Sequence, residues 1–91
     1  MRSLKELLQF LHDYIEKNGL IEYTGLCVTI GFMEAANKIS FDEFHLLAGY
    51  IRKNRPNWID NGDENEFWGW EPGALEPRLI WLKEQIKKLS S

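Results

Sequence analysis

The chain has 91 residues, of which 44% are hydrophobic and 27% charged, and its formal net charge is −3. These values are ordinary for one small globular domain, and a chain this short buries only about two-thirds of its unfolded surface. The negative charge argues against a protein that grips nucleic-acid phosphates through a basic surface. We therefore expect one helical domain over 1–91 and do not expect nucleic acid as its partner.

The cysteine count and the hydrophobic pattern exclude two further classes. Cys27 is the sole cysteine, so no internal disulfide can form, which is typical of a protein from a reducing compartment. The N-terminal segment lacks the apolar stretch and the cleavage site of a signal peptide. No segment approaches the roughly 20 apolar residues that cross a membrane. We expect a cytoplasmic protein that makes no membrane contact.

The first predicted helix spans 4–18. Ser3 and Glu6 form a capping-box pattern, in which each side chain can bond the free backbone N–H of the other. Apolar residues then follow at helical spacing, namely Leu4, Leu7, Leu8, Leu11 and Ile15. Gly19 comes next and is typical of the residue that stops a helix.

The second predicted helix spans 25–37 and follows Thr24, a favourable capping residue. Its centre contains consecutive β-branched residues and Gly31, all of which lower helix propensity. A strand over 25–32 is therefore the alternative.

The third predicted helix spans 41–54. Ser40 and Glu43 repeat the capping-box pattern at its start. Pro56 ends it, because proline lacks a backbone N–H and restricts the residue before it.

The fourth predicted helix spans 77–89, with Pro77 in its first turn. The expected fold is all-α, a small bundle of four helices. Its core should include three leucines from different helices, Leu8, Leu47 and Leu82.

A long aromatic and acidic loop, 55–76, separates the third and fourth helices. Loops of this length are uncommon in compact domains and are either functional or disordered. Its centre is polar and acidic, whereas its flanks carry large aromatic residues, which disordered segments lack. We expect an ordered aromatic loop with a flexible acidic tip, and a type II turn at Pro72 and Gly73 that leads into the fourth helix.

No pattern of catalytic or metal-ligating residues stands out. His12, His45 and Cys27 are scattered and lack the paired spacing of zinc sites. His12 and Glu16 lie one helical turn apart and are interpreted as a solvated contact, His45 as a surface residue, and Cys27 as a buried structural thiol. No glycine-rich phosphate loop is present. We expect a protein that is not an enzyme and binds no metal and no cofactor.

The candidate binding surface combines arginines with the aromatic loop. Trp and Arg are the residues most enriched at interaction hot spots. Guanidinium groups match phosphate or carboxylate, and aromatic planes stack on bases. The predicted binding residues are Arg52, Arg55, Trp58, Phe67, Trp68, Trp70 and Arg78. The alternative is that the aromatics form a lid over the core while the arginines pair with nearby glutamates.

Four segments resemble small hypothetical proteins of tailed bacteriophages. They are "TGLC" at 24–27, "SFDEF" at 40–44, "YIRKNRP" at 50–56 and "FWGWEPGALEPRLIWL" at 67–82. The resemblance covers most of the chain from residue 20 onward. The resemblance implies a biological setting, a bacteriophage, and no particular activity. Small accessory phage proteins are often non-enzymatic antagonists of host systems. Such proteins block a host protein or sequester a nucleotide immune signal.

Three functions follow as hypotheses. The first is a phage-encoded binding protein that acts against a host defence system in the host cytoplasm, by sequestering an anionic, nucleotide-like ligand or by blocking a host protein. The second is a structural or assembly protein whose Trp-rich surface is a permanent self-interface. The third, less favoured, is a nucleic-acid-binding module that uses the lysines of the fourth helix. We also expect a homo-oligomer, because an exposed aromatic patch is uncommon on a stable monomer.

Overall fold

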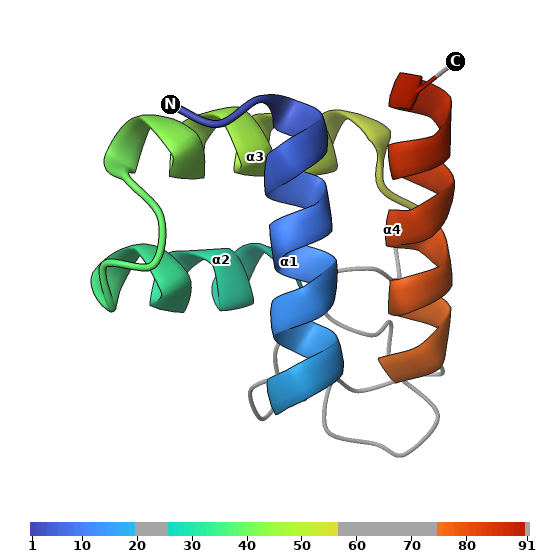
Figure 1. Ribbon diagram of the computed structural model, residues 1–91, viewed down its shortest axis with the longest axis horizontal. Coiled ribbons are helices and arrows are strands. Elements are labelled where there is room, and N and C mark those ends of the chain that lie inside the picture. Colours follow the sequence, from blue (N-terminus) through green and yellow to red (C-terminus); the bar gives the residue numbers. More distant parts are fainter. Residues whose placement is uncertain (20–25, 57–74, 91) are drawn as a thin grey trace.

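The computed structural model describes residues 1–19, 26–56 and 75–90 (Figure 1). These residues form the helices α1 (Leu4–Asn18), α2 (Leu26–Ala35), α3 (Phe41–Asn54) and α4 (Leu75–Ser90), with no strand among them. The expected all-α fold is confirmed. The strand alternative is wrong for its described part, because residues 26–32 are helical.

The helices are arranged as two pairs that cross (Figure 1). Helices α1 and α4 lie side by side and run in opposite directions, and α2 and α3 form a hairpin directed across them. Helix α3 also contacts α1, so α1 packs on both α4 and the hairpin. Among the described helices, none combines the length and the apolar character that a bilayer crossing requires.

Both capping boxes predicted from the sequence are present. Ser3 Oγ accepts the Glu6 backbone N–H at 3.2 Å, and Glu6 Oε1 accepts the Ser3 N–H at 3.0 Å. The same exchange joins Ser40 and Glu43 at 3.1 and 2.9 Å. Each box satisfies two backbone donors that a helix start leaves without partners. This local chemistry explains why α1 and α3 begin at the residues expected.

Helix α2 ends two residues before the predicted position, at a Schellman motif. Asn37 adopts a left-handed conformation with φ of 60°, and its N–H donates to the carbonyl of Glu34 at 2.9 Å. The N–H of Lys38 donates to the carbonyl of Met33 at 2.8 Å. Asparagine is one of the few residues besides glycine that adopt this conformation readily. The motif reverses the chain and fixes the backbone of Lys38.

A proline lies near the C-terminal end of α3 and another lies in the first turn of α4. Arg55 is extended, with φ of −72° and ψ of 145°, so α3 stops at Asn54 as the following Pro56 predicts. Helix α4 begins at Leu75, two residues earlier than predicted. Pro77 is the third residue of α4. Its missing N–H costs no helical hydrogen bond, because the first four backbone N–H groups of any helix have no partner within the helix.

One hydrophobic cluster joins the four helices. Leu8 of α1, Leu47 of α3 and Leu82 of α4 are completely buried in it, so all three predicted core positions are confirmed. Helix α2 adds Ile30 and Met33, also completely buried. The core therefore lies where the two helix pairs cross.

Candidate functional site

Only three of the seven predicted binding residues lie in the described parts of the chain. Arg52 and Arg55 are exposed at the C-terminal end of α3, whereas Arg78 is completely buried in α4. Arg78 therefore does not offer its guanidinium to an open surface, and burial lowers its pKa. The remaining predicted residues lie outside the described residues, namely Trp58, Phe67, Trp68 and Trp70. The same holds for Thr24 and for the turn predicted at 72–73.

Arg55 extends from the end of α3 to the start of α2. Its Nη1 lies 4.0 Å from Sγ of Cys27. Cys27 is half-buried and packs against the core cluster, where full burial was expected. The contact gives this thiol a structural position between two helices.

The interpretation of His12 as a solvated residue is wrong. The residue is 3% exposed, Nδ1 lies 3.0 Å from Oδ1 of Asp13, and Nε2 is buried without a hydrogen-bond partner among the described residues. Ligand atoms of His12, Asp13 and Glu16 lie within 4.8 Å of one another. However, a metal-binding histidine donates its second ring nitrogen to a polar partner, and Nε2 has none. We therefore assign no metal to this cluster. His45, by contrast, is exposed as predicted.

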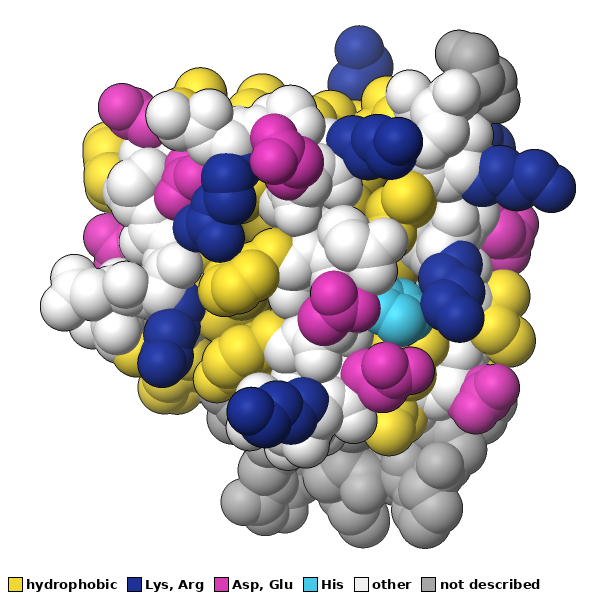
Figure 2. Space-filling view, viewed as in Figure 1, with side chains coloured by type: hydrophobic (Ala, Val, Ile, Leu, Met, Phe, Trp, Pro, Cys, Tyr) yellow, Lys and Arg dark blue, Asp and Glu magenta, His cyan; other side chains and the backbone are white. Residues whose placement is uncertain are grey.

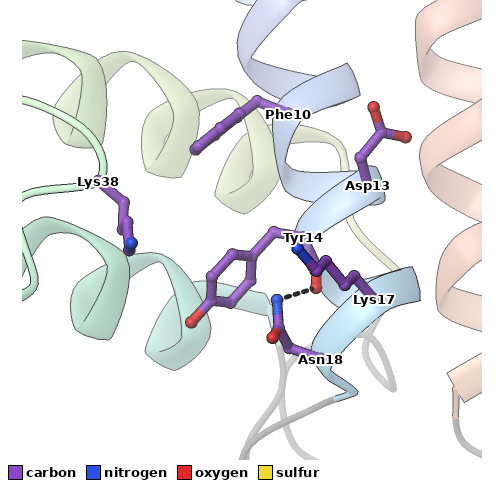
Figure 3. Close-up of a pocket in the computed structure, with 6 residues that line it drawn as sticks. All are labelled: Phe10, Asp13, Tyr14, Lys17, Asn18 and Lys38. Carbon is purple, nitrogen blue, oxygen red and sulfur yellow. Dashed lines mark hydrogen bonds between the residues drawn. The ribbon is translucent and has the colours of Figure 1, made fainter.

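A cavity of about 420 Å³ lies on α1, next to the turn that joins α2 to α3 (Figure 3). We call it the α1 pocket, and its lining residues are Phe10, Asp13, Tyr14, Lys17, Asn18 and Lys38. Small-molecule sites have volumes of about 300–1,000 Å³. The α1 pocket is therefore large enough for a ligand the size of a mononucleotide.

The lining side chains of the α1 pocket separate by chemical type. Figure 3 shows the rings of Phe10 and Tyr14 pointing from α1 toward Lys38. Lys17 runs back along α1 toward Tyr14, whereas Asp13 points the other way, toward α4. Two aromatic rings and two lysine side chains thus line one space, and Asp13 lines its edge nearer α4.

The negative charge of Asp13 is satisfied within α1. Its Oδ1 accepts from Nε2 of Gln9 at 2.9 Å and lies 3.0 Å from Nδ1 of His12. These hydrogen bonds, that of His12 foremost, hold the pKa of Asp13 below its usual value. Lys17 and Lys38, in contrast, have no ion-pair partner among the described residues. The lining of the α1 pocket therefore carries two ammonium groups and one hydrogen-bonded carboxylate, and its net charge is positive.

The C-terminal end of α1 forms one wall of the α1 pocket. Nδ2 of Asn18 donates to the carbonyl of Tyr14 at 2.9 Å. Gly19 has φ of 77°, which favours glycine, and its N–H donates to the carbonyl of Ile15 at 2.7 Å. These bonds satisfy carbonyls at the helix end and hold Asn18 against the pocket.

The opposite wall is fixed by the Arg2–Glu43 ion pair. Nε and Nη2 of Arg2 donate to the two carboxylate oxygens of Glu43 at 2.9 and 3.0 Å, and the Arg2 backbone N–H adds a third bond at 3.0 Å. Nη2 also donates to the carbonyl of Lys38 at 3.1 Å, and Cζ lies 4.4 Å from the centre of the Phe10 ring. One arginine thus joins α3, the turn that carries Lys38 and the aromatic wall.

Glu43 is the anion on which this wall depends. The Arg2 side chain, followed by the backbone N–H of Ser40, holds the pKa of Glu43 well below its usual range. The carboxylate is therefore ionised at neutral pH and serves the ion pair and the capping box together.

The molecular surface shows the same region from outside. In Figure 2, hydrophobic side chains reach the surface between α1 and the α2–α3 hairpin, with Lys and Arg side chains around them. An apolar floor with a cationic rim is the pattern expected of a site for an anion that also carries an apolar part.

Sequence reasoning missed the α1 pocket. Phe10 and Tyr14 lie four residues apart beside the leucine stripe of α1, followed by Lys17, and this is the only local signal. Lys38 belongs to a turn beyond α2, and its place beside Phe10 depends on how the hairpin packs on α1. Comparisons of the chain with protein-family models, curated proteins and solved structures found no significant match. The α1 pocket is therefore assigned as the candidate site on its geometry alone.

Proposed function

We propose that the protein is a non-enzymatic binding protein that holds a small anionic ligand with a flat ring, of the nucleotide type, in the α1 pocket. The observation that carries this proposal is a cavity of about 420 Å³ lined by two aromatic rings and by two lysines that form no ion pair with any residue of 1–19, 26–56 or 75–90. The lysines come from separate elements, α1 and the α2–α3 turn.

Each part of the α1 pocket suits one part of such a ligand. The ammonium groups of Lys17 and Lys38 complement phosphate, and the rings of Phe10 and Tyr14 supply faces on which a base can stack. The Asn18 amide supplies a polar group of the kind that orients a bound molecule. The described lining contains neither a thiol nor an imidazole, which favours holding a ligand over converting it.

The resemblance to tailed-phage proteins supplies the biological setting of the proposal. In that setting the ligand is a nucleotide signal of a host defence system, and binding withdraws the signal from its receptor in the host cytoplasm. A protein of 91 residues suits this role, because sequestration needs one pocket and no catalytic machinery.

The proposal is tested by calorimetric titration of the full chain with two probes, adenosine monophosphate and cyclic di-adenosine monophosphate. Lys38→Glu reverses one charge of the α1 pocket, and Tyr14→Leu removes a ring while keeping an apolar side chain. Each should weaken binding by about tenfold or more. Lys88→Glu makes the same change of charge at an exposed position of α4 and should bind like the unmodified protein.

Two results would contradict the proposal. One is that neither probe binds the unmodified protein at concentrations up to about 1 mM. The other is that Lys38→Glu and Lys88→Glu weaken binding equally, because the net charge of the molecule would then explain the effect without the pocket.

A further inference from the structure

The charges that line the α1 pocket are separated in space. Figure 3 places Lys38 on the side of the α2–α3 turn and Asp13 at the opposite edge, nearer α4. Lys17 lies one helical turn after Asp13 but runs back along α1 toward Tyr14. All three charged residues are described, and no ion pair joins this carboxylate to either ammonium group. The α1 pocket therefore has a cationic part and a separate anionic edge.

The carboxylate of Asp13 is ionised and has hydrogen-bond partners on one oxygen. Oδ1 accepts from Nε2 of Gln9 and lies 3.0 Å from Nδ1 of His12. These contacts, that of His12 foremost, lower the pKa of Asp13, so the group is an anion at neutral pH. No described residue donates to Oδ2, and the side chain is 61% exposed. Oδ2 is therefore open to a hydrogen-bond donor of a ligand and repels an anionic group.

We infer that Asp13 determines the specificity of the α1 pocket and limits it to ligands with phosphate at one end and hydroxyl or amino groups at the other. The ligand class is then a nucleoside monophosphate. This inference rests on the proposed function, because it concerns the same pocket and narrows the same kind of ligand.

A nucleoside monophosphate matches this distribution of charge. Its phosphate carries a charge of about −2 at neutral pH, which the two ammonium groups of Lys17 and Lys38 balance. Its base has a flat face that can stack on the rings of Phe10 and Tyr14. Its ribose hydroxyls and any exocyclic amino group are donors, which an ionised carboxylate accepts. Each end of such a ligand thus meets groups of the opposite kind.

A second phosphate at the far end of the ligand meets Asp13 instead of a lysine. Nucleoside 3′,5′-bisphosphates and cyclic dinucleotides carry such a group. Like charges brought together oppose binding. The exposure of Asp13 and the positive charge of Lys83, which acts on it from α4, reduce this repulsion. We therefore expect a preference of about tenfold for the monophosphate.

The test is calorimetric titration of the full chain with adenosine monophosphate and adenosine 3′,5′-bisphosphate, which share the base and the ribose and differ by one phosphate. The unmodified chain should bind the monophosphate about tenfold more tightly. Asp13→Asn removes the charge but keeps an oxygen that can accept from Gln9 and His12. It should bring the two Kd values within about threefold of each other, chiefly by strengthening binding of the bisphosphate. Glu84→Gln removes one negative charge at an exposed position of α4 outside the α1 pocket and should keep the tenfold preference.

The ratio of the two Kd values separates the role of Asp13 from the proposed function. Equal affinity of the unmodified chain for both probes would overturn the inference and leave the pocket standing, and this result does not depend on whether a variant folds. The inference would also be overturned if Asp13→Asn left the ratio unchanged, or if Glu84→Gln changed it as much. If adenosine monophosphate does not bind at concentrations up to about 1 mM, the proposed function is contradicted and the inference with it.

Discussion

Two single residues, Asn37 and Glu43, hold the turn that carries Lys38. Asn37 takes the left-handed conformation that reverses the chain after α2. Glu43 binds Arg2, which in turn donates to the carbonyl of Lys38. Neither residue lines the α1 pocket, yet together they determine where one of its two cations stands.

Replacing Asn37 tests the first of these contributions. Asn37→Ala should lower the free energy of unfolding by about 1 kcal/mol, because an alanine in the left-handed region is strained. Asn37→Gly should leave stability unchanged or raise it, since glycine has no Cβ to strain. Urea denaturation of both variants measures the difference. Equal stability of the alanine variant and the unmodified protein would contradict the assigned role.

Replacing Glu43 tests the second contribution through its dependence on pH. The pKa of Glu43 in the folded protein lies below its ordinary value of 4.5. The carboxylate therefore stabilises the fold above that value, and this contribution is lost as the pH falls toward the folded pKa. Glu43→Gln should reduce the free energy of unfolding at neutral pH, and the difference from the unmodified protein should shrink as the pH falls below 4.5.

Urea denaturation at several pH values measures this difference. Glu84→Gln removes an exposed glutamate of α4 and should change stability little at any of them. A difference for Glu43→Gln that grows on acidification would show that its carboxylate does not stabilise the native state.

At the scale of helices, the sequence predicted the bounds of α1 and α3, the two helices with capping boxes. It did not predict the α1 pocket. Ser3 and Ser40 act on residues three positions away, so their effect is visible in the sequence. The Schellman end of α2 is also local, but Asn37 was not recognised as its left-handed residue. The α1 pocket depends on packing, because Lys38 faces Phe10 only when the hairpin crosses α1. No spacing along the chain encodes that contact.

Helix α3 offers a matched pair of leucines that tests its packing. Leu47 is completely buried and Leu46 is 37% exposed, although they are neighbours in the sequence. Leu47→Ala should lower the free energy of unfolding by about 2–5 kcal/mol, because it leaves a cavity in the core. Leu46→Ala should change it by about 0.5 kcal/mol or less. Similar losses for the two variants in urea denaturation would mean that the buried face of α3 is wrongly assigned.

At the scale of the whole molecule, the α1 pocket adjoins the hydrophobic core. The core occupies the crossing of the two helix pairs, and Phe10 and Tyr14 both pack against the core cluster and line the α1 pocket. We expect one nucleotide bound per chain at every protein concentration.

The most direct test of ligand binding at the α1 pocket is NMR mapping of adenosine monophosphate on the ¹⁵N-labelled full chain, with inorganic phosphate as a second probe. Adenosine monophosphate should shift the amide signals of Phe10, Tyr14, Asn18 and Lys38 in a saturable way. Inorganic phosphate should act more weakly and mainly near the lysines, and Lys38→Glu should weaken the response to both probes. Shifts centred instead on Arg52 and Arg55 at the end of α3, with the signals of Phe10 and Tyr14 unmoved, would contradict the proposed site.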